Sequence, residues 1–277
     1  ADDRARGRWV MTVVAVAGDC TTTTCVALAA AWYAGDEVII LEADPSGGSL
    51  AGWLDTPSSP SLASAVAATT AANRSAADTI DSVVQRSRSG LRFIAAPVRS
   101  LPASRAIAEA SATIIPELSL RRDVVVLADL GRPAGERSPL LDAATVIVIA
   151  HRQSPTSAAA ESVRLERLLE HVEHLAATGA PLVLAVIGRD PFDPDVVVRF
   201  VDDSVPGATS DVCRLADDPL AAAVLAGRAG VSARRLMRLP LMRSAADAAG
   251  RLRPHLIAPA RPSAWLTTDR LNSEARP

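Results

Sequence analysis

The chain has 277 residues, of which 49% are hydrophobic and 22% are charged, with a formal net charge of −2. High apolar content and low net charge exclude a disordered chain, and the near-zero balance disfavours a protein that coats nucleic acid over its whole surface. Three cysteines, an odd number, disfavour a disulfide scaffold and favour a reducing compartment. All 29 basic residues are arginines, so no lysine ammonium is available to any mechanism. No uncharged apolar run approaches the ~18–20 residues of a membrane span, and no basic–apolar leader is expected at the start.

Short apolar runs rich in β-branched residues alternate with helical patterns along the chain. The apolar runs predict strands at residues 9–16, 38–41, 91–95, 123–127, 145–150, 182–187 and 211–215. The segments between them predict helices at residues 22–33, 63–70, 76–86, 104–115, 155–176, 196–201, 218–225 and 235–252. This alternation predicts an α/β fold with a single doubly wound, mainly parallel sheet and helices on both faces. We expect one domain over residues 9–254, a disordered arm at 1–8 and a peripheral tail at 255–277.

The junction after the first strand is the first place to look for a ligand, because parallel sheets bind ligands at the carboxyl ends of strands. A P-loop carries G-x-x-x-x-G-K-[ST] at this point, and its backbone amides cradle phosphates. The candidate nucleotide or phosphate loop here comprises Gly18, Asp19, Cys20, Thr21, Thr22, Thr23 and Thr24. The competing interpretation is a hydroxyl-rich helix start, in which threonine side chains cap free amides.

Four segments resemble the ParA/MinD superfamily of deviant P-loop ATPases: VVAVAGDCTTTTCVALAAAW, VIILEADPSGGSLAGWLD, DVVVLADLGRPAG and ATVIVIAHRQSPTSAAA. A later region, LADDPLAAAVLAG followed by RRLMRLPLMRSAADAA, resembles the end of the same domain in the CpaE/TadZ branch, which is associated with Tad pilus and secretion machinery. The resemblance covers nearly the whole globular part and implies a P-loop NTPase fold. It also implies a homodimer formed through the nucleotide face.

Carried over by position, the resemblance makes Asp44 the catalytic aspartate that orients water. It makes Thr23 and Asp129 the residues that hold Mg²⁺ once a nucleotide binds. Both family lysines are missing, since their positions fall on Ala17 and Thr22. One charge pair at 4 Å is worth about 4 kcal/mol at an effective dielectric constant of 20, so ATP and Mg²⁺ are expected to bind weakly through this degenerate Walker A loop.

Two alternatives concern these positions. An arginine at a strand end (Arg132, Arg152 or Arg189) could replace the lost lysine. The segment that begins at Asp44 could also be a turn that binds no ligand, because its residue types favour turns. Cys20 and Cys25 are expected to be small buried residues, and the four histidines show no metal-ligand spacing with the cysteines.

The C-terminal region holds a cluster of basic residues that we call the arginine patch: Arg228, Arg234, Arg235, Arg238 and Arg243. Such a patch could bind DNA phosphates, an anionic membrane or an acidic protein partner, or it could be a solvated helical face. A weak amphipathic pattern in the tail does not favour membrane targeting by that segment.

These observations favour a degenerate ParA/MinD-like protein that does not hydrolyse nucleotide. We expect it to be a cytoplasmic positioning or scaffold subunit of an envelope-associated machine of the Tad type, recruited to the membrane by protein partners. The first alternative is an active ATPase in which an arginine replaces the P-loop lysine. The second is a DNA-binding partition or septum-placement factor.

Overall fold

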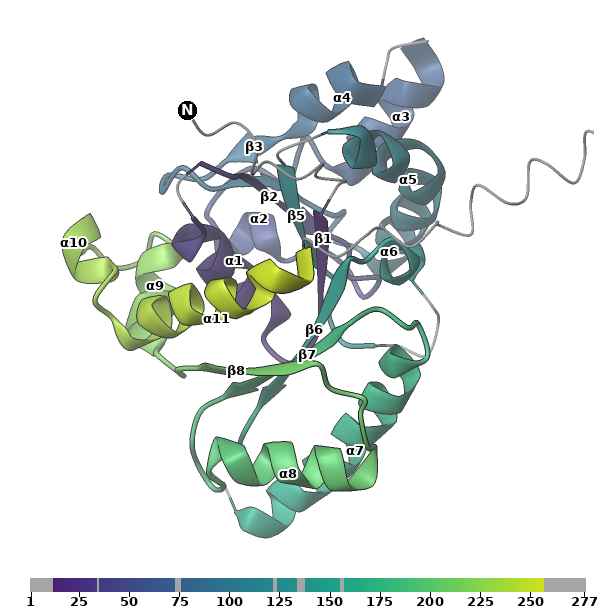
Figure 1. The fold of residues 1–277 in the computed structure, drawn as a ribbon. Coiled ribbons are helices and arrows are strands. Elements are labelled where there is room, and N and C mark those ends of the chain that lie inside the picture. Colours follow the sequence, from purple (N-terminus) through teal and green to yellow (C-terminus); the bar gives the residue numbers. More distant parts are fainter. Residues whose placement is uncertain are drawn as a thin grey trace, which may run out of the picture.

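An eight-stranded sheet with the order β3-β4-β2-β5-β1-β6-β7-β8 forms the centre of the computed structural model (Figure 1). The structure describes residues 12–256 except 34, 73–75, 122–123, 134–137 and 155–156. All strand pairs are parallel except β3–β4, which is antiparallel. The strands are β1 (Thr12–Gly18), β2 (Glu37–Glu42), β3 (Gln85–Arg86), β4 (Arg92–Ile94), β5 (Val124–Asp129), β6 (Val146–Arg152), β7 (Leu182–Ile187) and β8 (Asp211–Leu215). The predicted doubly wound, mainly parallel sheet is therefore confirmed.

Helices cover both faces of the sheet (Figure 1). They are α1 (Thr21–Ala31), α2 (Leu50–Trp53), α3 (Leu62–Ala72), α4 (Ala76–Val83), α5 (Ser100–Leu120), α6 (Pro139–Asp142), α7 (Ala158–Ala176), α8 (Pro194–Ser204), α9 (Pro219–Leu225), α10 (Ala233–Leu236) and α11 (Pro240–Leu256). One core lies under α3 to α8, and the other lies under α1, α2, α9 and α11. Along β1, Val13 faces the first core and Val14 the second, because successive side chains of a strand point to opposite faces.

The structure corrects several predicted boundaries. Pro116 lies inside α5 and does not follow it, because Ile114 and Leu118 on either side are fully buried and hold the last turns against the core. The helix expected at 235–252 is two helices, and the second starts at Pro240, a residue suited to the first turn. The apolar pattern of the helix predicted at 155–176 also places Val163 in the core, but Val163 is 55% exposed on α7.

The sequence patterns also missed three short elements. These are β3, α2 and α6, none longer than four residues and so too short to show a period. The arm at 1–8 lies outside the described residues. The expected tail overlaps α11 at residues 255–256, and the rest of the tail lies outside the described part.

Candidate functional site

The loops after the four central strands meet at one edge of the sheet. In the strand register, Asp129 at the end of β5 lies opposite both Val16 of β1 and Glu42 of β2, and Gly18 lies opposite Ala150 of β6. The segments that follow these strands therefore share one edge. The structure brings together there the predicted loop, Asp44 and Asp129, as expected for carboxyl ends of parallel strands.

The connection between β1 and α1 is a turn of two residues, Asp19 and Cys20. Gly18 is the last residue of β1, with a φ of 111°, and a Cβ there would lie 2.3 Å from the carbonyl oxygen of Ala150. Cys20 has a left-handed conformation with a φ of 52°. The threonines predicted for the loop belong to the first turn of α1. The turn carries the Asp19 carboxylate, and a negative charge at this place repels a phosphate group.

Asp129 is a buried carboxylate, 1% exposed, beside the start of α1. Its Oδ2 accepts a hydrogen bond of 2.6 Å from the Thr22 hydroxyl, and its Oδ1 accepts one of 3.2 Å from the Gly131 amide. Burial raises the pKa of Asp129, although hydrogen bonds from Thr21, Thr22 and Gly131 act in the opposite direction. The carboxylate is therefore held by neutral hydrogen-bond donors.

Thr22 is the threonine whose hydroxyl reaches Asp129. The role that the resemblance gives to Thr23, holding Mg²⁺ once a nucleotide binds, stays a prediction. The competing interpretation, in which threonine side chains cap α1, is wrong, because the capping position is Cys20 and no side chain caps the helix there. The Thr22 hydroxyl points to Asp129 instead. Cys20 itself is exposed, against the expectation, whereas Cys25 is buried as expected.

Asp44 follows β2 and lies against the loop after β5. Its Oδ1 accepts a hydrogen bond of 2.8 Å from the Ser46 amide, which is the geometry of an Asx turn. Gly131 has a φ of 64°, and a Cβ there would lie 2.1 Å from Asp44 Oδ2. Only glycine allows this close approach. The negative charge of Asp44 contributes to the raised pKa of Asp129, because the two carboxylates repel each other.

Asp19 is the most highly connected side chain of the turn. Its carboxylate forms ion pairs with Arg164 (2.5 Å) and Arg132 (3.2 Å) and accepts a hydrogen bond of 3.3 Å from the Arg152 amide. The Arg152 guanidinium itself is paired with Asp217, 2.7 Å away. Of the arginines predicted to replace the missing lysine, Arg132 and Arg152 are thus engaged by carboxylates, and Arg189 is exposed.

Sequence reasoning missed two buried acidic groups. Glu161 of α7 is fully buried and lies 2.6 Å from the ring of His151, which follows the apolar part of β6. Glu42, at the end of β2, accepts hydrogen bonds from the amides of Ser49 (2.5 Å), Leu50 (2.7 Å) and Ala96 (2.9 Å). A carboxylate at the end of an apolar strand is the sequence signal that could have identified Glu42.

The residues at this edge do not fit a nucleotide with its Mg²⁺. The lysine of the motif is absent, the turn carries a carboxylate, and Arg132 and Arg164 are already paired with it. In the described part of the chain, no group of three or more histidine, cysteine, aspartate or glutamate residues could hold a metal ion.

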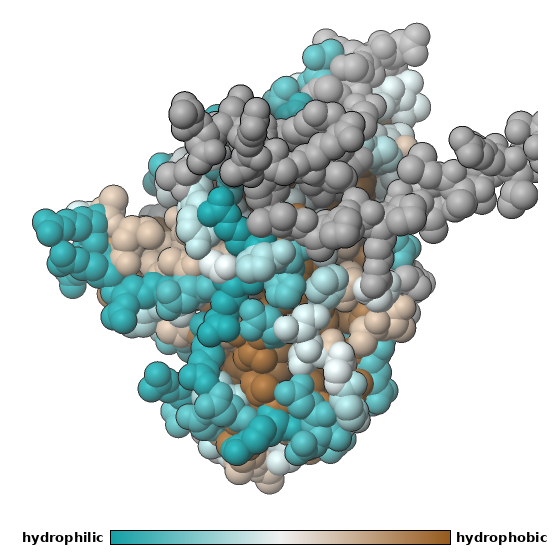
Figure 2. Space-filling model, viewed as in Figure 1, coloured by the Kyte–Doolittle hydropathy of each residue, from teal (hydrophilic) through white to brown (hydrophobic). Residues whose placement is uncertain are grey.

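The arginine patch lies on and around α9 to α11, and all five of its side chains are exposed. In Figure 1, α10 projects from the body of the molecule, and Figure 2 shows hydrophilic surface at the tip of this projection. The Arg228 guanidinium lies 5.8 Å from the centre of the Trp53 ring. Within the described ranges, no ion pair joins any member of the patch to an acidic residue.

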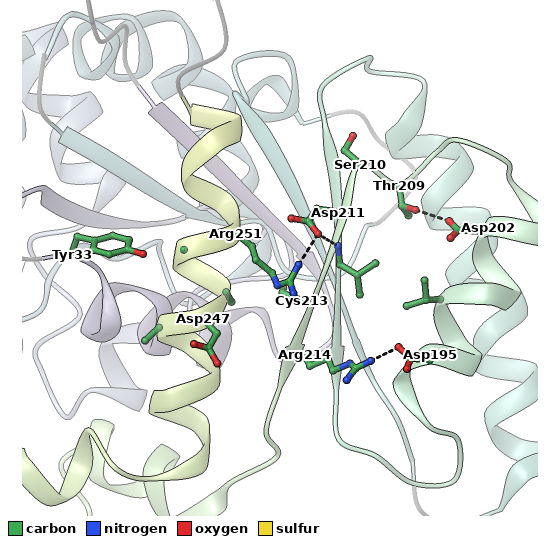
Figure 3. A pocket seen from close by; sticks show the side chains of 15 residues that line it. Tyr33, Asp195, Asp202, Thr209, Ser210, Asp211, Cys213, Arg214, Asp247 and Arg251 are labelled. Atoms are coloured by element: carbon green, nitrogen blue, oxygen red, sulfur yellow. Dashed lines mark hydrogen bonds and ion pairs between the residues drawn. The ribbon is translucent and has the colours of Figure 1, made fainter. Parts of the chain in front are cut away.

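A groove of about 930 Å³ lies away from this edge, along β8 between α8 and α11 (Figure 3). Two ion pairs line the groove: Arg251 of α11 with Asp211 of β8 at 3.2 Å, and Arg214 of β8 with Asp195 of α8. Among the described residues, no helix has the length and apolar character needed to cross a bilayer.

Comparison with known proteins relates the chain to solved structures alone. No family model matches the sequence, and no curated protein matches it significantly. The fold is similar to the septum site-determining protein MinD from Pyrococcus horikoshii, complexed with Mg-ADP (TM-score 0.63, 13% identity, covering 87% of this chain and 96% of that one). It is also similar to a ParA family ATPase from Chlorobium tepidum (TM-score 0.61, 15% identity, 88% and 98%). A MinC:MinD complex from Aquifex aeolicus gives a TM-score of 0.58 at 13% identity, covering 88% and 96%. The chain therefore has a MinD/ParA-like fold.

Proposed function

We propose that this chain is a ParA/MinD-like protein that does not hydrolyse nucleotide and that serves as a positioning or scaffold subunit. The observation that carries the proposal is the Asp19 carboxylate in the turn between β1 and α1, which places a paired negative charge where a phosphate-binding loop would hold its ligand. The missing lysine and the paired arginines support the same conclusion. The fold then acts as a platform for protein contacts.

Titration calorimetry with ATP and ADP, with and without Mg²⁺, tests the loss of nucleotide function. We expect no heat of binding up to about 1 mM nucleotide, a limit that corresponds to about −4.1 kcal/mol. A double variant, Asp44→Ala with Asp129→Ala, is the matched control for heat that does not come from the site. Micromolar, Mg²⁺-dependent binding that is weakened in the double variant would contradict the proposal and favour the active ATPase with an arginine in place of lysine.

The scaffold role is proposed for an envelope-associated assembly of the Tad pilus or secretion type, on the strength of the CpaE/TadZ-like sequence segments near α9 to α11. We place the protein in the cytoplasm as a homodimer, recruited to the membrane by protein partners. The solved complex of a MinD with MinC supports the general idea that this fold serves protein assemblies. Light scattering coupled to size exclusion tests the dimer, and a mass that does not change with nucleotide is the expected result.

A second candidate function, DNA binding in partition or septum placement, rests on the exposed arginine patch. If the patch grips phosphates, the logarithm of the binding constant falls steeply with the logarithm of salt, with a slope of about −0.9 per phosphate neutralised. The triple variant Arg234→Ala, Arg235→Ala and Arg238→Ala should then reduce the slope by about 3. The control replaces three exposed arginines elsewhere by alanine: Arg105, Arg167 and Arg199. Equal slopes for both triple variants would exclude the patch as a DNA site.

A further inference from the structure

Asp19 holds together three segments that are distant in the sequence. Its backbone amide donates a hydrogen bond of 2.7 Å to the carbonyl of Ala150, which fixes the turn against β6. Its carboxylate lies between Arg132, in the loop after β5, and Arg164, on α7. The Asp19 side chain is 19% exposed, so these contacts are partly shielded from water. One carboxylate thus joins the turn after β1 to the loops after β5 and β6 and to α7.

Arg164 is held in place to receive this carboxylate. Its guanidinium donates a hydrogen bond of 2.6 Å to the carbonyl of Arg152, and its Nε lies 3.4 Å from Glu161 Oε2. Glu161 is in turn fixed by the ring of His151 (2.6 Å) and by the amide of Ser154 (2.8 Å). A guanidinium oriented by buried partners presents its remaining donors in a fixed direction, which favours a charge-assisted bond to an oxyanion.

We propose that Asp19 is an internal counter-ion: its carboxylate takes the place of a phosphate group between Arg132 and Arg164, holds the loops of this edge together and keeps phosphate-bearing ligands out. The proposal rests on the proposed function, because it explains how the edge stays closed without nucleotide. A phosphate could bridge the two guanidinium groups only by displacing Asp19, whose negative charge also repels it. The turn therefore carries its own anion.

The test frees the two arginines with the near-isosteric variant Asp19→Asn and uses inorganic phosphate as the probe. The melting temperature of the full chain is measured in potassium phosphate and in potassium chloride at equal ionic strength. We expect Asp19→Asn to lower the melting temperature by about 2–4 °C in chloride, a typical shift for a domain of this size that loses one interaction. Phosphate should restore most of this loss in the variant and have little specific effect on the wild type.

The double variant Asp19→Asn with Arg164→Gln is the control, and phosphate should no longer rescue it. Equal phosphate responses in Asp19→Asn and the wild type would overturn the proposal. If Asp19→Asn does not fold, the variant Arg132→Gln tests the same ion pair from its other partner, because Arg132 is 78% exposed and its loss leaves the core intact. The counter-ion predicts a lower melting temperature for Arg132→Gln at low salt and a smaller difference at high salt, and no difference at low salt would overturn it. Nucleotide binding by the wild type would contradict the proposed function and the exclusion of phosphate-bearing ligands, whereas the melting temperatures of the variants test the ion pairs of Asp19 separately.

Discussion

The replacement Asp129→Asn should stabilise the folded protein at neutral pH. Asp129 is a buried carboxylate whose pKa is raised by burial, so its charged form costs free energy in the folded state. Asparagine keeps an oxygen for the Gly131 amide, and the Thr22 hydroxyl can rotate from donor to acceptor toward the new amide group. We expect a gain of about 0.5–2 kcal/mol in the free energy of unfolding, the usual range for one stabilising substitution.

Urea unfolding of Asp129→Asn and the wild type, at several pH values, measures this gain. The folded-state pKa of Asp129 lies above its unfolded value, so the wild type recovers the lost stability as pH falls toward the folded-state pKa and the carboxyl becomes protonated. The gain should therefore be largest at neutral pH and shrink on acidification. A destabilised variant at neutral pH, or a difference that does not change with pH, would refute this account of the site.

Three further predictions concern neighbouring groups. Glu42→Ala should lower the free energy of unfolding in urea by about 2–6 kcal/mol, because it leaves the buried amides of Leu50 and Ala96 without an acceptor. The control, Glu109→Ala at an exposed glutamate, should change this free energy little. Gly131→Ala should lower the free energy of unfolding by about 1–3 kcal/mol, because the residue has a positive φ and its Cβ would collide with Asp44. Thermal melting measures this loss, and an unchanged melting temperature would contradict the collision. Burial lowers the pKa of His151 below that of the unfolded chain, so stability should decrease as pH falls through about 6.5, and His151→Gln should show a smaller decrease over the same pH series.

The sequence predicted the fold because its strands are unambiguous. Buried parallel strands are continuous apolar runs, and the bounds of β7 and β8 agree with the prediction at both ends. Polar residues that follow such runs lie at the carboxyl edge of a parallel sheet, which explains why the sequence predicted Asp44 and Asp129 at neighbouring strand ends. Helix ends were less predictable. Pro116 remains inside α5 because tertiary burial of its neighbours outweighs the local preference to end the helix.

Side-chain partners were beyond the sequence patterns, because they depend on the three-dimensional register. The distance between Asp19 and Arg164 along the chain is 145 residues, and no local spacing relates them. The pairing of His151 with Glu161 depends on the point at which α7 returns to the sheet. The hydrogen bond from the Thr22 hydroxyl to Asp129 likewise joins residues that are 107 positions apart in the sequence.

The turn between β1 and α1 also provides a natural attachment point for a spectroscopic probe. Cys20 is exposed there, whereas Cys25 is completely buried and Cys213 is 3% exposed, and these are the three cysteines of the chain. Although the residue as a whole is exposed, partial burial of its sulfur raises the pKa of Cys20. Alkylation by a maleimide dye should therefore be slow at neutral pH and faster in mild alkali. A dye on Cys20 would sit next to Asp19 without any engineered residue. Its fluorescence would then report movements of this edge when protein partners bind.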